Sequence, residues 1–353
     1  MPRSWRKIMT GLVLLWVVHS TFGSREGRAQ EPRTGLPPGS IGASALDIFT
    51  AETSSTEGAL RILLPTGARA VGMGRAVTAL QGSESAFWNP AGLARIQEGR
   101  FVVLRGTPLV GEATAFSLLL AKQPLGVLAV SYQFLDMGDQ DLTDKDNNIL
   151  GSVSFRDHLG IVSFATQILP RLDGGVNFKV FSTRATCRGL CSTSGVSGTT
   201  YSLDLGVQAE PVATLPLRLA FMVAHLGPNL QIINVEQADP LPTRMRVAGA
   251  YEILRHFTEL PLLELWMTAE LEDRLFDLGS PVLYLGSEFA AGEEDQIFVR
   301  AGYGQSQAGQ AAGASVGLGL RYQQFEMGIA KSLSSTSLSG SSEPIHITFG
   351  VIF

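Results

Sequence analysis

Three short patterns in this sequence contain residue types that could do chemistry. The first is Gly313-Ala314-Ser315-Val316-Gly317, which matches the G-x-S-x-G pattern of a serine nucleophile. Such a serine needs a strand that turns sharply into a helix. Here the pattern lies inside a stretch of alternating apolar and small residues, so we expect a plain strand and no catalytic residue.

The second pattern is acidic. Asp144, Asp146 and Asn148 have the spacing of the first three ligands of a calcium-binding loop. The sixth position of that loop would be Ile149 and the twelfth Phe155, where calcium binding needs glycine and glutamate. A solvated acidic loop is the better interpretation, and we predict no metal site.

The third pattern is a cysteine pair. Cys187 and Cys191 are the only cysteines, and in an oxidising compartment we expect a local disulfide between them in an outer loop. A metal site would need further ligands. Gly72-x-Gly74 lacks the third glycine of a dinucleotide site. No enzyme and no cofactor is predicted from these patterns.

The N-terminus has the features of a secretory signal peptide over residues 1–29. A basic start precedes the apolar core IMTGLVLLWVV, and Gly27-Arg28-Ala29 supplies a small-x-small cleavage site. An uncleaved anchor is the alternative. Removing these residues takes away five basic residues and one acidic residue, so the formal charge changes from -5 to -9. This balance and the lack of a basic run argue against a nucleic-acid partner.

Composition narrows the class of protein further. Residues 30–57 are rich in Pro, Gly, Ser and Thr, which is typical of a flexible leader, here expected in the periplasm. Only 17% of residues are charged, and after the signal peptide no apolar run reaches the length of a membrane-spanning helix. A closed β-barrel is the remaining way to cross a membrane, because it satisfies every backbone group without helices.

Residues 99–353 alternate apolar and polar side chains in about fourteen segments separated by turn residues. In one segment Leu263, Met267 and Leu271 share a face, while Glu264 and Glu270 occupy the other. One face suits lipid and the other a polar lumen. We therefore predict an all-β fold, a transmembrane antiparallel β-barrel of about 14 strands. A soluble periplasmic β-sandwich or propeller is the alternative.

The connections between the segments support an outer-membrane location. Those after odd-numbered segments are long, at 135–156, 183–198, 226–242 and 332–344, and those after even-numbered segments are short. Outer-membrane barrels with a periplasmic N-terminus have this arrangement of long outer loops and short inner turns. The cell outer membrane of a Gram-negative envelope is thus the predicted location, and its lipid a predicted partner.

Two sets of strand residues are assigned roles from this alternation. Charges on the inward face are expected to form a lumen network of Asp204, Arg244, Arg246, Glu264, Glu270, Arg300, Arg321 and Glu326. The last segment alternates to a terminal phenylalanine and resembles the strand that the barrel-assembly machinery recognises. Its predicted assembly signal is Phe349, Val351 and Phe353.

Residues 58–96, GALRILLPTGARAVGMGRAVTALQGSESAFWNPAGLARI, differ in character from the alternating part. They resemble the start of the PorV/PorQ-like proteins, which belong with the FadL-type hydrophobic-compound channels in a superfamily of fourteen-stranded barrels. The motif residues are Gly67, Arg69, Gly72, Gly74, Trp88, Asn89, Pro90, Ala91 and Gly92. The match departs at Gly74-Arg75, where the family usually has Gly-Gly, and at Gly82-Ser83-Glu84, where it often has an acidic pair.

The resemblance implies an N-terminal plug (hatch) over residues 58–98. Asn89 is a good N-cap and Pro90 a good first helical residue, so a short helical turn is expected there. Arg69 and Arg75 are expected to pair with inward charges such as Asp204, Glu264, Glu270 or Glu326. A rigid segment that caps the periplasmic mouth is the alternative.

Two functions follow from the resemblance. The first is binding or passive transport of hydrophobic small molecules across the outer membrane. The second is a PorV-like part of type IX protein secretion, with secretion-system proteins as partners and secreted cargo bound at the outer loops. A closed barrel with a structural role is a third possibility.

Overall fold

The computed structural model describes residues 57–107, 111–191, 195–232, 238–256, 262–305, 313–333 and 344–353. The predicted signal peptide and all but the last residue of the predicted leader lie outside the described residues. In the described ranges, no helix has both the length and the apolar character needed to span a membrane.

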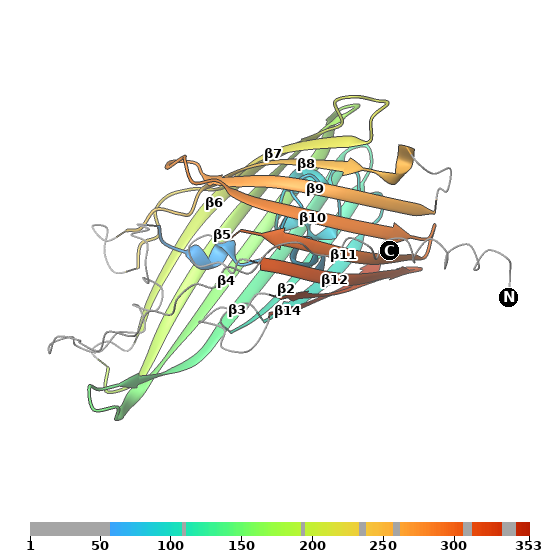
Figure 1. Ribbon diagram of the computed structural model, residues 1–353. Coiled ribbons are helices and arrows are strands. Elements are labelled where there is room, and N and C mark those ends of the chain that lie inside the picture. Colours follow the sequence, from blue (N-terminus) through green and yellow to red (C-terminus); the bar gives the residue numbers. More distant parts are fainter. Residues whose placement is uncertain are drawn as a thin grey trace, which may run out of the picture. The chain divides into compact units, whose positions relative to one another are not determined.

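In the described part of the chain, fourteen antiparallel strands close into a ring in which β1 pairs with both β2 and β14 (Figure 1). The strands are β1 (Arg100–Gly106), β2 (Glu112–Lys122), β3 (Gly126–Thr143), β4 (Ile149–Leu169), β5 (Leu172–Gly189), β6 (Gly195–Ala209), β7 (Leu217–Leu226), β8 (Arg244–Glu252), β9 (Leu263–Arg274), β10 (Val282–Ala291), β11 (Gln296–Gly304), β12 (Gly313–Tyr322), β13 (Phe325–Ser332) and β14 (Ile345–Ile352). The predicted all-β barrel is confirmed.

The alternation along each strand separates two faces of the wall. On β6, Tyr201 and Leu205 are 55% and 52% exposed, whereas Asp204 between them is fully buried. On β9, Met267 points outward and Glu270 inward. Successive side chains of a strand point to opposite faces, so the apolar residues that alternate with these buried groups lie outside the ring.

Two of the predicted long loops are wrong. Most of 135–156 belongs to β3 and β4, and most of 183–198 belongs to β5 and β6, which pair out to these positions. The outward face becomes polar there, as at Asp136 and Arg156, while backbone pairing continues. The apolar alternation therefore ends before the strands do. Figure 1 shows β3 to β6 extending beyond β9 to β12 at one end of the wall.

Residues 58–98, called the inner segment below, precede β1. They contain the short helices η2 (Leu60–Leu63), α2 (Ala68–Gly72), η3 (Ser83–Ala86) and η4 (Pro90–Leu93), and η6 (Leu254–His256) follows β8. Helix α2 contacts β11 to β14, whereas η4 contacts β4 to β6. These two groups of strands lie on opposite sides of the ring, so the inner segment lies within the barrel.

The inner segment runs along the barrel from one end to the other. At one end, the Gly58 N–H donates to the Pro240 carbonyl at 2.9 Å in the connection 227–243. At the other end, the Phe353 N–H donates to the Gly99 carbonyl at 2.9 Å, just before β1 begins. We call this second end the turn end, because the short connections 123–125, 170–171 and 323–324 lie there. The last residue of the predicted leader lies at the opposite end.

Candidate functional site

Asn89 begins η4 and caps it, as its sequence context predicts. Its side-chain Oδ1 accepts a hydrogen bond from the Ala91 N–H at 3.1 Å, and Pro90 occupies the first position of the helix. Its Nδ2 also donates to the Thr78 carbonyl at 2.9 Å. Asn89 is 1% exposed, so one buried side chain both caps η4 and ties it to an earlier part of the inner segment.

Glycines allow the inner segment to approach the wall closely. A Cβ added at Gly206 of β6 would collide with Oδ1 of Asn89, and one at Gly302 of β11 would collide with the backbone of Gly74. Gly74 itself has a φ of 60°, which favours glycine. Apart from Arg69, which is half-buried, the residues of the predicted motif are all buried: Gly67, Gly72, Gly74, Trp88, Asn89, Pro90, Ala91 and Gly92.

Arg69 attaches α2 to the wall through a carboxylate that sequence reasoning missed. Its Nε and Nη2 donate to the two carboxylate oxygens of Glu288 at 2.8 and 2.6 Å, and its Nη1 donates to the Gln81 carbonyl. Arg300 donates to the same carboxylate at 2.6 Å. The predicted pairing of Arg69 with Asp204, Glu264, Glu270 or Glu326 is therefore wrong. Glu288 and Arg300 are inward register partners on β10 and β11. Arg300 was predicted as an inward charge, and the same alternation of apolar and polar residues could have indicated Glu288.

Glu84 is a second carboxylate at this attachment. It accepts hydrogen bonds from the N–H groups of Arg69 and Ala70 and from the hydroxyl of Thr348 on β14. Burial raises the pKa of the Glu84 carboxyl above its ordinary value, and these three donors act in the opposite direction. Glu84 therefore joins η3 to the start of α2 and connects both to β14.

Arg75 contacts aromatic rings, which were not predicted. Its guanidinium lies 5.8 Å from the ring centroid of Trp88 and 5.2 Å from that of Tyr284, and it donates to the Leu63 carbonyl at 3.1 Å. Such cation–π contacts stabilise a partly desolvated cation. Arg75 thus links the inner segment to β10 through aromatic rings.

Two of the predicted carboxylates do hold the inner segment, through hydroxyl groups. Glu270 accepts from the Thr78 N–H at 3.0 Å and from its hydroxyl at 2.7 Å. Glu326 accepts from the Ser83 hydroxyl at 3.0 Å. The inner segment is therefore attached to β9 and β13 as well as to β10.

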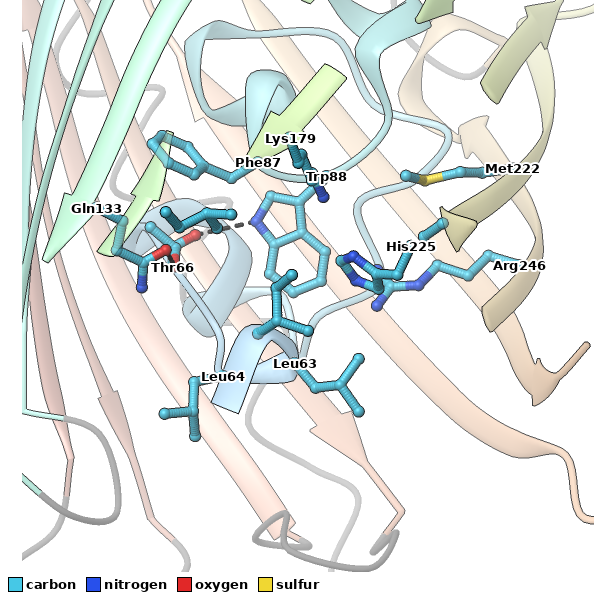
Figure 2. Close-up of a pocket in the computed structure, with 13 residues that line it drawn as sticks. Leu63, Leu64, Thr66, Phe87, Trp88, Gln133, Lys179, Met222, His225 and Arg246 are labelled. Atoms are coloured by element: carbon cyan, nitrogen blue, oxygen red, sulfur yellow. Dashed lines mark hydrogen bonds between the residues drawn. The ribbon is translucent and has the colours of Figure 1, made fainter. Parts of the chain in front are cut away.

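A small cavity of about 30 Å³ lies between the inner segment and the wall (Figure 2). Figure 2 shows Trp88 at its centre, with Leu63 and Leu64 on one side and Met222 and His225 on another. The Trp88 indole N–H donates to the Thr66 carbonyl at 2.9 Å, which fixes the ring. The lining residues are Ile62, Leu63, Leu64, Thr66, Phe87, Trp88, Gln133, Leu159, Lys179, Met222, Ala224, His225 and Arg246.

The polar part of this cavity consists of paired charges. Lys179 Nζ lies 2.6 Å from one Asp204 carboxylate oxygen, and the backbone N–H of His225 donates to the other oxygen at 2.9 Å. Arg246 lies 2.5 Å from a Glu272 oxygen and 5.0 Å from the Trp88 ring centroid. Buried charges need such partners, so the cavity combines paired charged groups with aromatic and aliphatic side chains.

The predicted lumen charges all lie on the inner side of the wall, but in separate groups. Arg244 pairs with Glu57 at 2.8 Å and Arg321 with Glu326 at 2.7 Å, while Glu264 accepts from the Trp266 indole at 3.2 Å. The residues concerned are Asp204, Arg244, Arg246, Glu264, Glu270, Arg300, Arg321 and Glu326. Sequence reasoning missed Lys179, Glu272 and Glu288 as partners, although each lies on the inward phase of its strand.

The wall changes register beside the cavity. Leu203 pairs with Leu226, but Leu205 pairs with Val223, so β7 has one more residue than β6 in this interval. His225 lies in the interval and has a φ of 61°, which is unusual for a residue other than glycine. Strand β3, by contrast, pairs without a shift with β4 from 127 to 136.

The patterns that suggested other chemistry have structural roles. Ser315 lies within β12 and faces the lumen, in a strand that does not turn into a helix. Asp144 accepts hydrogen bonds from the N–H groups of Asp146 and Asn148 in the tight turn between β3 and β4. The Asn148 side chain holds the pKa of the Asp144 carboxyl below its ordinary value. The hydrogen bonds organise the turn itself.

Cys187 and Cys191 form a disulfide, with 6.2 Å between their Cα atoms. The bond joins the end of β5 to the residues after it, so Cys187 lies in a strand and not in a loop. Among the described residues, no group of three or more His, Cys, Asp or Glu side chains could hold a metal ion.

Comparison with known proteins shows similarity at the level of fold. No family model and no curated protein matches this chain. Among solved structures it is similar to the CymD monoaromatic hydrocarbon channel, with 12% identity, a TM-score of 0.52, and 81% of this chain and 96% of that chain covered. It is also similar to the Pseudomonas putida toluene transporter TodX, with 9% identity, a TM-score of 0.50, and coverage of 81% and 96%.

A TodX deltaS2S3 mutant monoaromatic hydrocarbon channel gives 12% identity and a TM-score of 0.54, with 82% of this chain and 98% of that chain covered. These similarities define a fold shared with hydrophobic-compound channels and agree with the FadL-type part of the resemblance. The PorV/PorQ part stays a prediction.

Proposed function

We propose that this chain is an outer-membrane channel that binds hydrophobic small molecules and lets them pass passively, with the inner segment as its plug. One observation carries the proposal. A closed ring of strands surrounds an attached segment, in a fold shared with channels for monoaromatic hydrocarbons. The chemistry is binding and passage, with no bond made or broken.

The outward face supports a membrane location. Large apolar side chains are exposed on it around the ring, for example Leu205 at 52%, Phe221 at 43%, Leu318 at 57% and Ile347 at 49%. In water such a belt would be unfavourable by roughly 25 cal/mol per Å² of apolar surface. A bilayer removes this penalty, and a closed ring leaves no strand edge unpaired in it.

The size of the cavity bears on how a ligand would move. A volume of about 30 Å³ accommodates little more than one water molecule, whereas small-molecule sites measure roughly 300–1,000 Å³. A hydrocarbon therefore needs the inner segment to shift. The aliphatic and aromatic side chains around Trp88, beside the paired charges, would then form part of the binding surface.

The register shift between β6 and β7 provides a route from this cavity toward lipid. Ala224 and His225 line the cavity and lie in the interval where the two strands are out of register. Backbone pairing is interrupted there, so opening this seam breaks fewer hydrogen bonds than opening a regular pair of strands. We propose that the ligand leaves the lumen here.

The experiment is uptake of toluene by cells that express the chain or lack it. A cysteine pair at Leu205 and Val223 would join β6 to β7 when oxidised, and we expect it to reduce uptake to the level of the deletion strain. The pair at Leu318 and Ile329 is the control, because these outward register partners join β12 to β13 away from the cavity.

All variants carry serine in place of Cys187 and Cys191, so that no other cysteine interferes. Equal uptake with and without the chain would overturn the channel proposal and favour the alternative, a PorV-like secretion component that binds cargo proteins. Normal uptake through the oxidised β6–β7 variant would overturn the route but leave the channel proposal in place.

A further inference from the structure

A second cavity lies on the other side of the inner segment, toward the turn end. Its volume is about 340 Å³, within the range of small-molecule sites. Residues 80–84 of the inner segment form one side, and strands β7 and β9 to β14 with the start of β1 form the rest. It shares no lining residue with the cavity around Trp88, so it requires an explanation of its own.

The lining is rich in guanidinium groups. Five arginines and four glutamates line the cavity, which gives a formal net charge of +1 from these nine side chains. The arginines are Arg69, Arg100, Arg218, Arg300 and Arg321. An apolar ligand would have to displace water from all of them without replacing its hydrogen bonds. The chemistry of the wall therefore favours a polar anion.

Two of the carboxylates are each shared by two arginines. One Glu326 oxygen accepts from Arg100 at 3.0 Å and from Arg321 at 2.7 Å and 3.0 Å. Glu288 is shared in the same way by Arg69 and Arg300. Each group therefore has one positive charge more than its carboxylate neutralises.

The other two carboxylates accept hydrogen bonds from uncharged donor groups. Glu84 accepts from two backbone N–H groups and the Thr348 hydroxyl, and Glu264 accepts from the Trp266 indole. Glu264 is the second residue of β9 and lies near the turn end. Neither carboxylate forms an ion pair with the guanidinium groups of Arg100 and Arg321 across the cavity.

Aromatic rings hold three of the guanidinium groups in place. Arg218 lies 5.0 Å from the ring centroid of Trp266, and Arg300 and Arg321 lie 4.9 and 5.8 Å from that of Phe298. A guanidinium held on a ring presents its N–H donors in a fixed plane. Planar pairs of donors match the oxygens of carboxylates and phosphates.

We propose that this cavity binds a small, multiply charged oxyanion, with Arg100, Arg218 and Arg321 as its main ligands. Arg100 and Arg321 provide the excess charge at Glu326, and Arg218, whose Nη2 also donates to Glu210 at 3.3 Å, approaches from the Trp266 side. Gln81 and Gln296 also line the cavity and provide neutral donors. The site is distinct from the proposed hydrophobic site and does not depend on it.

The test is isothermal titration of the purified full chain in a non-ionic detergent with inorganic phosphate at constant ionic strength. We expect saturable binding that is weaker by about ten-fold or more in Arg321→Gln, because a charge-assisted hydrogen bond to the anion is lost. Arg218→Gln should weaken it similarly and serves if Arg321→Gln does not fold. Heat-modifiable migration on a gel identifies folded protein.

The control is Arg156→Gln, which removes an exposed arginine that pairs with Asp136 at 3.1 Å on the outer surface. It should leave phosphate binding unchanged. Titration with succinate distinguishes the two kinds of oxyanion: tighter binding of succinate that is lost in Arg321→Gln assigns the site to dicarboxylates. No saturable binding of either anion, or equal weakening in Arg156→Gln, would overturn the proposal.

Discussion

Replacing Asn89 with alanine tests whether one buried side chain keeps the inner segment in place. The change removes the acceptor that caps η4 at the Ala91 N–H, and the donor to the Thr78 carbonyl. Asn89 is 1% exposed, so water does not replace these bonds while the segment stays in place. The Thr78 carbonyl keeps a second donor, Gln208 Nε2, at 2.8 Å.

These contacts set the magnitude. Loss of an N-cap destabilises by about 1 kcal/mol. Loss of the bond to Thr78 adds about 1 kcal/mol, and not the larger penalty of an unsatisfied group, because Gln208 still donates to that carbonyl. The sum is about 2 kcal/mol, which raises the population of the undocked segment by a factor of about 30.

The assay is the labelling rate of a cysteine placed at Ser85, which is buried in η3. Cys187 and Cys191 are replaced with serine beforehand, so that the reporter is the only thiol. When reclosing is faster than labelling, the rate with a membrane-impermeant maleimide is proportional to the open population. We expect labelling about 30-fold faster in Asn89→Ala.

Two further variants separate the causes. Asn89→Ser retains a capping acceptor but loses the bond to Thr78, so labelling should be faster by about five-fold. Asn229→Ala removes an exposed amide from the connection 227–243 and should change nothing. If Asn89→Ala labels within about two-fold of the parent, the assignment of Asn89 as an anchor of the segment is refuted.

Two more changes test the docking of the inner segment with the same reporter. Gly206→Ala places a Cβ against Asn89 Oδ1 and should increase the labelling rate strongly. The control is Gly160→Ala on β4, which has nothing within 4 Å of the added Cβ and should not change the rate. Equal labelling rates in the two variants would contradict the role of close approach. Arg69→Gln should cost roughly 1.5–3 kcal/mol of docking free energy, because it removes charge-assisted hydrogen bonds to Glu288, which Arg300 still neutralises. A double-mutant cycle with Glu288→Gln should give a coupling above about 0.5 kcal/mol, and additive effects would exclude the ion pair as an anchor.

The strands of the barrel were largely predictable, but their ends were not. The period of two at Tyr201, Leu203 and Leu205 is a local property, and it predicted which side chains face outward on β6. The pairing of β3 with β4 continues past Asp136, after a register shift, although the outward face there is polar. Backbone groups carry no sequence signal, so the length of β3 and β4 could not be predicted from apolar alternation.

In the candidate site too, contacts between residues close in sequence were predictable, whereas contacts between distant residues were not. The cap at Asn89 joins residues two positions apart, and its chemistry is contained in Asn-Pro-Ala. The bond between Arg69 and Glu288 joins residues 219 positions apart. Several inward carboxylates were equivalent candidates for Arg69 by sequence, and only the position of α2 against β11 to β14 selects Glu288 on the adjacent β10.

The sequence by itself determined the class of fold, the two faces of the wall and the start of η4, because each depends on residue spacing over a few positions. The tertiary structure alone decided which charges pair, where β6 and β7 lose register, and that the inner segment separates a small cavity around Trp88 from a larger one lined by arginines. Ring closure brings distant residues together, and no spacing rule along the chain contains that geometry.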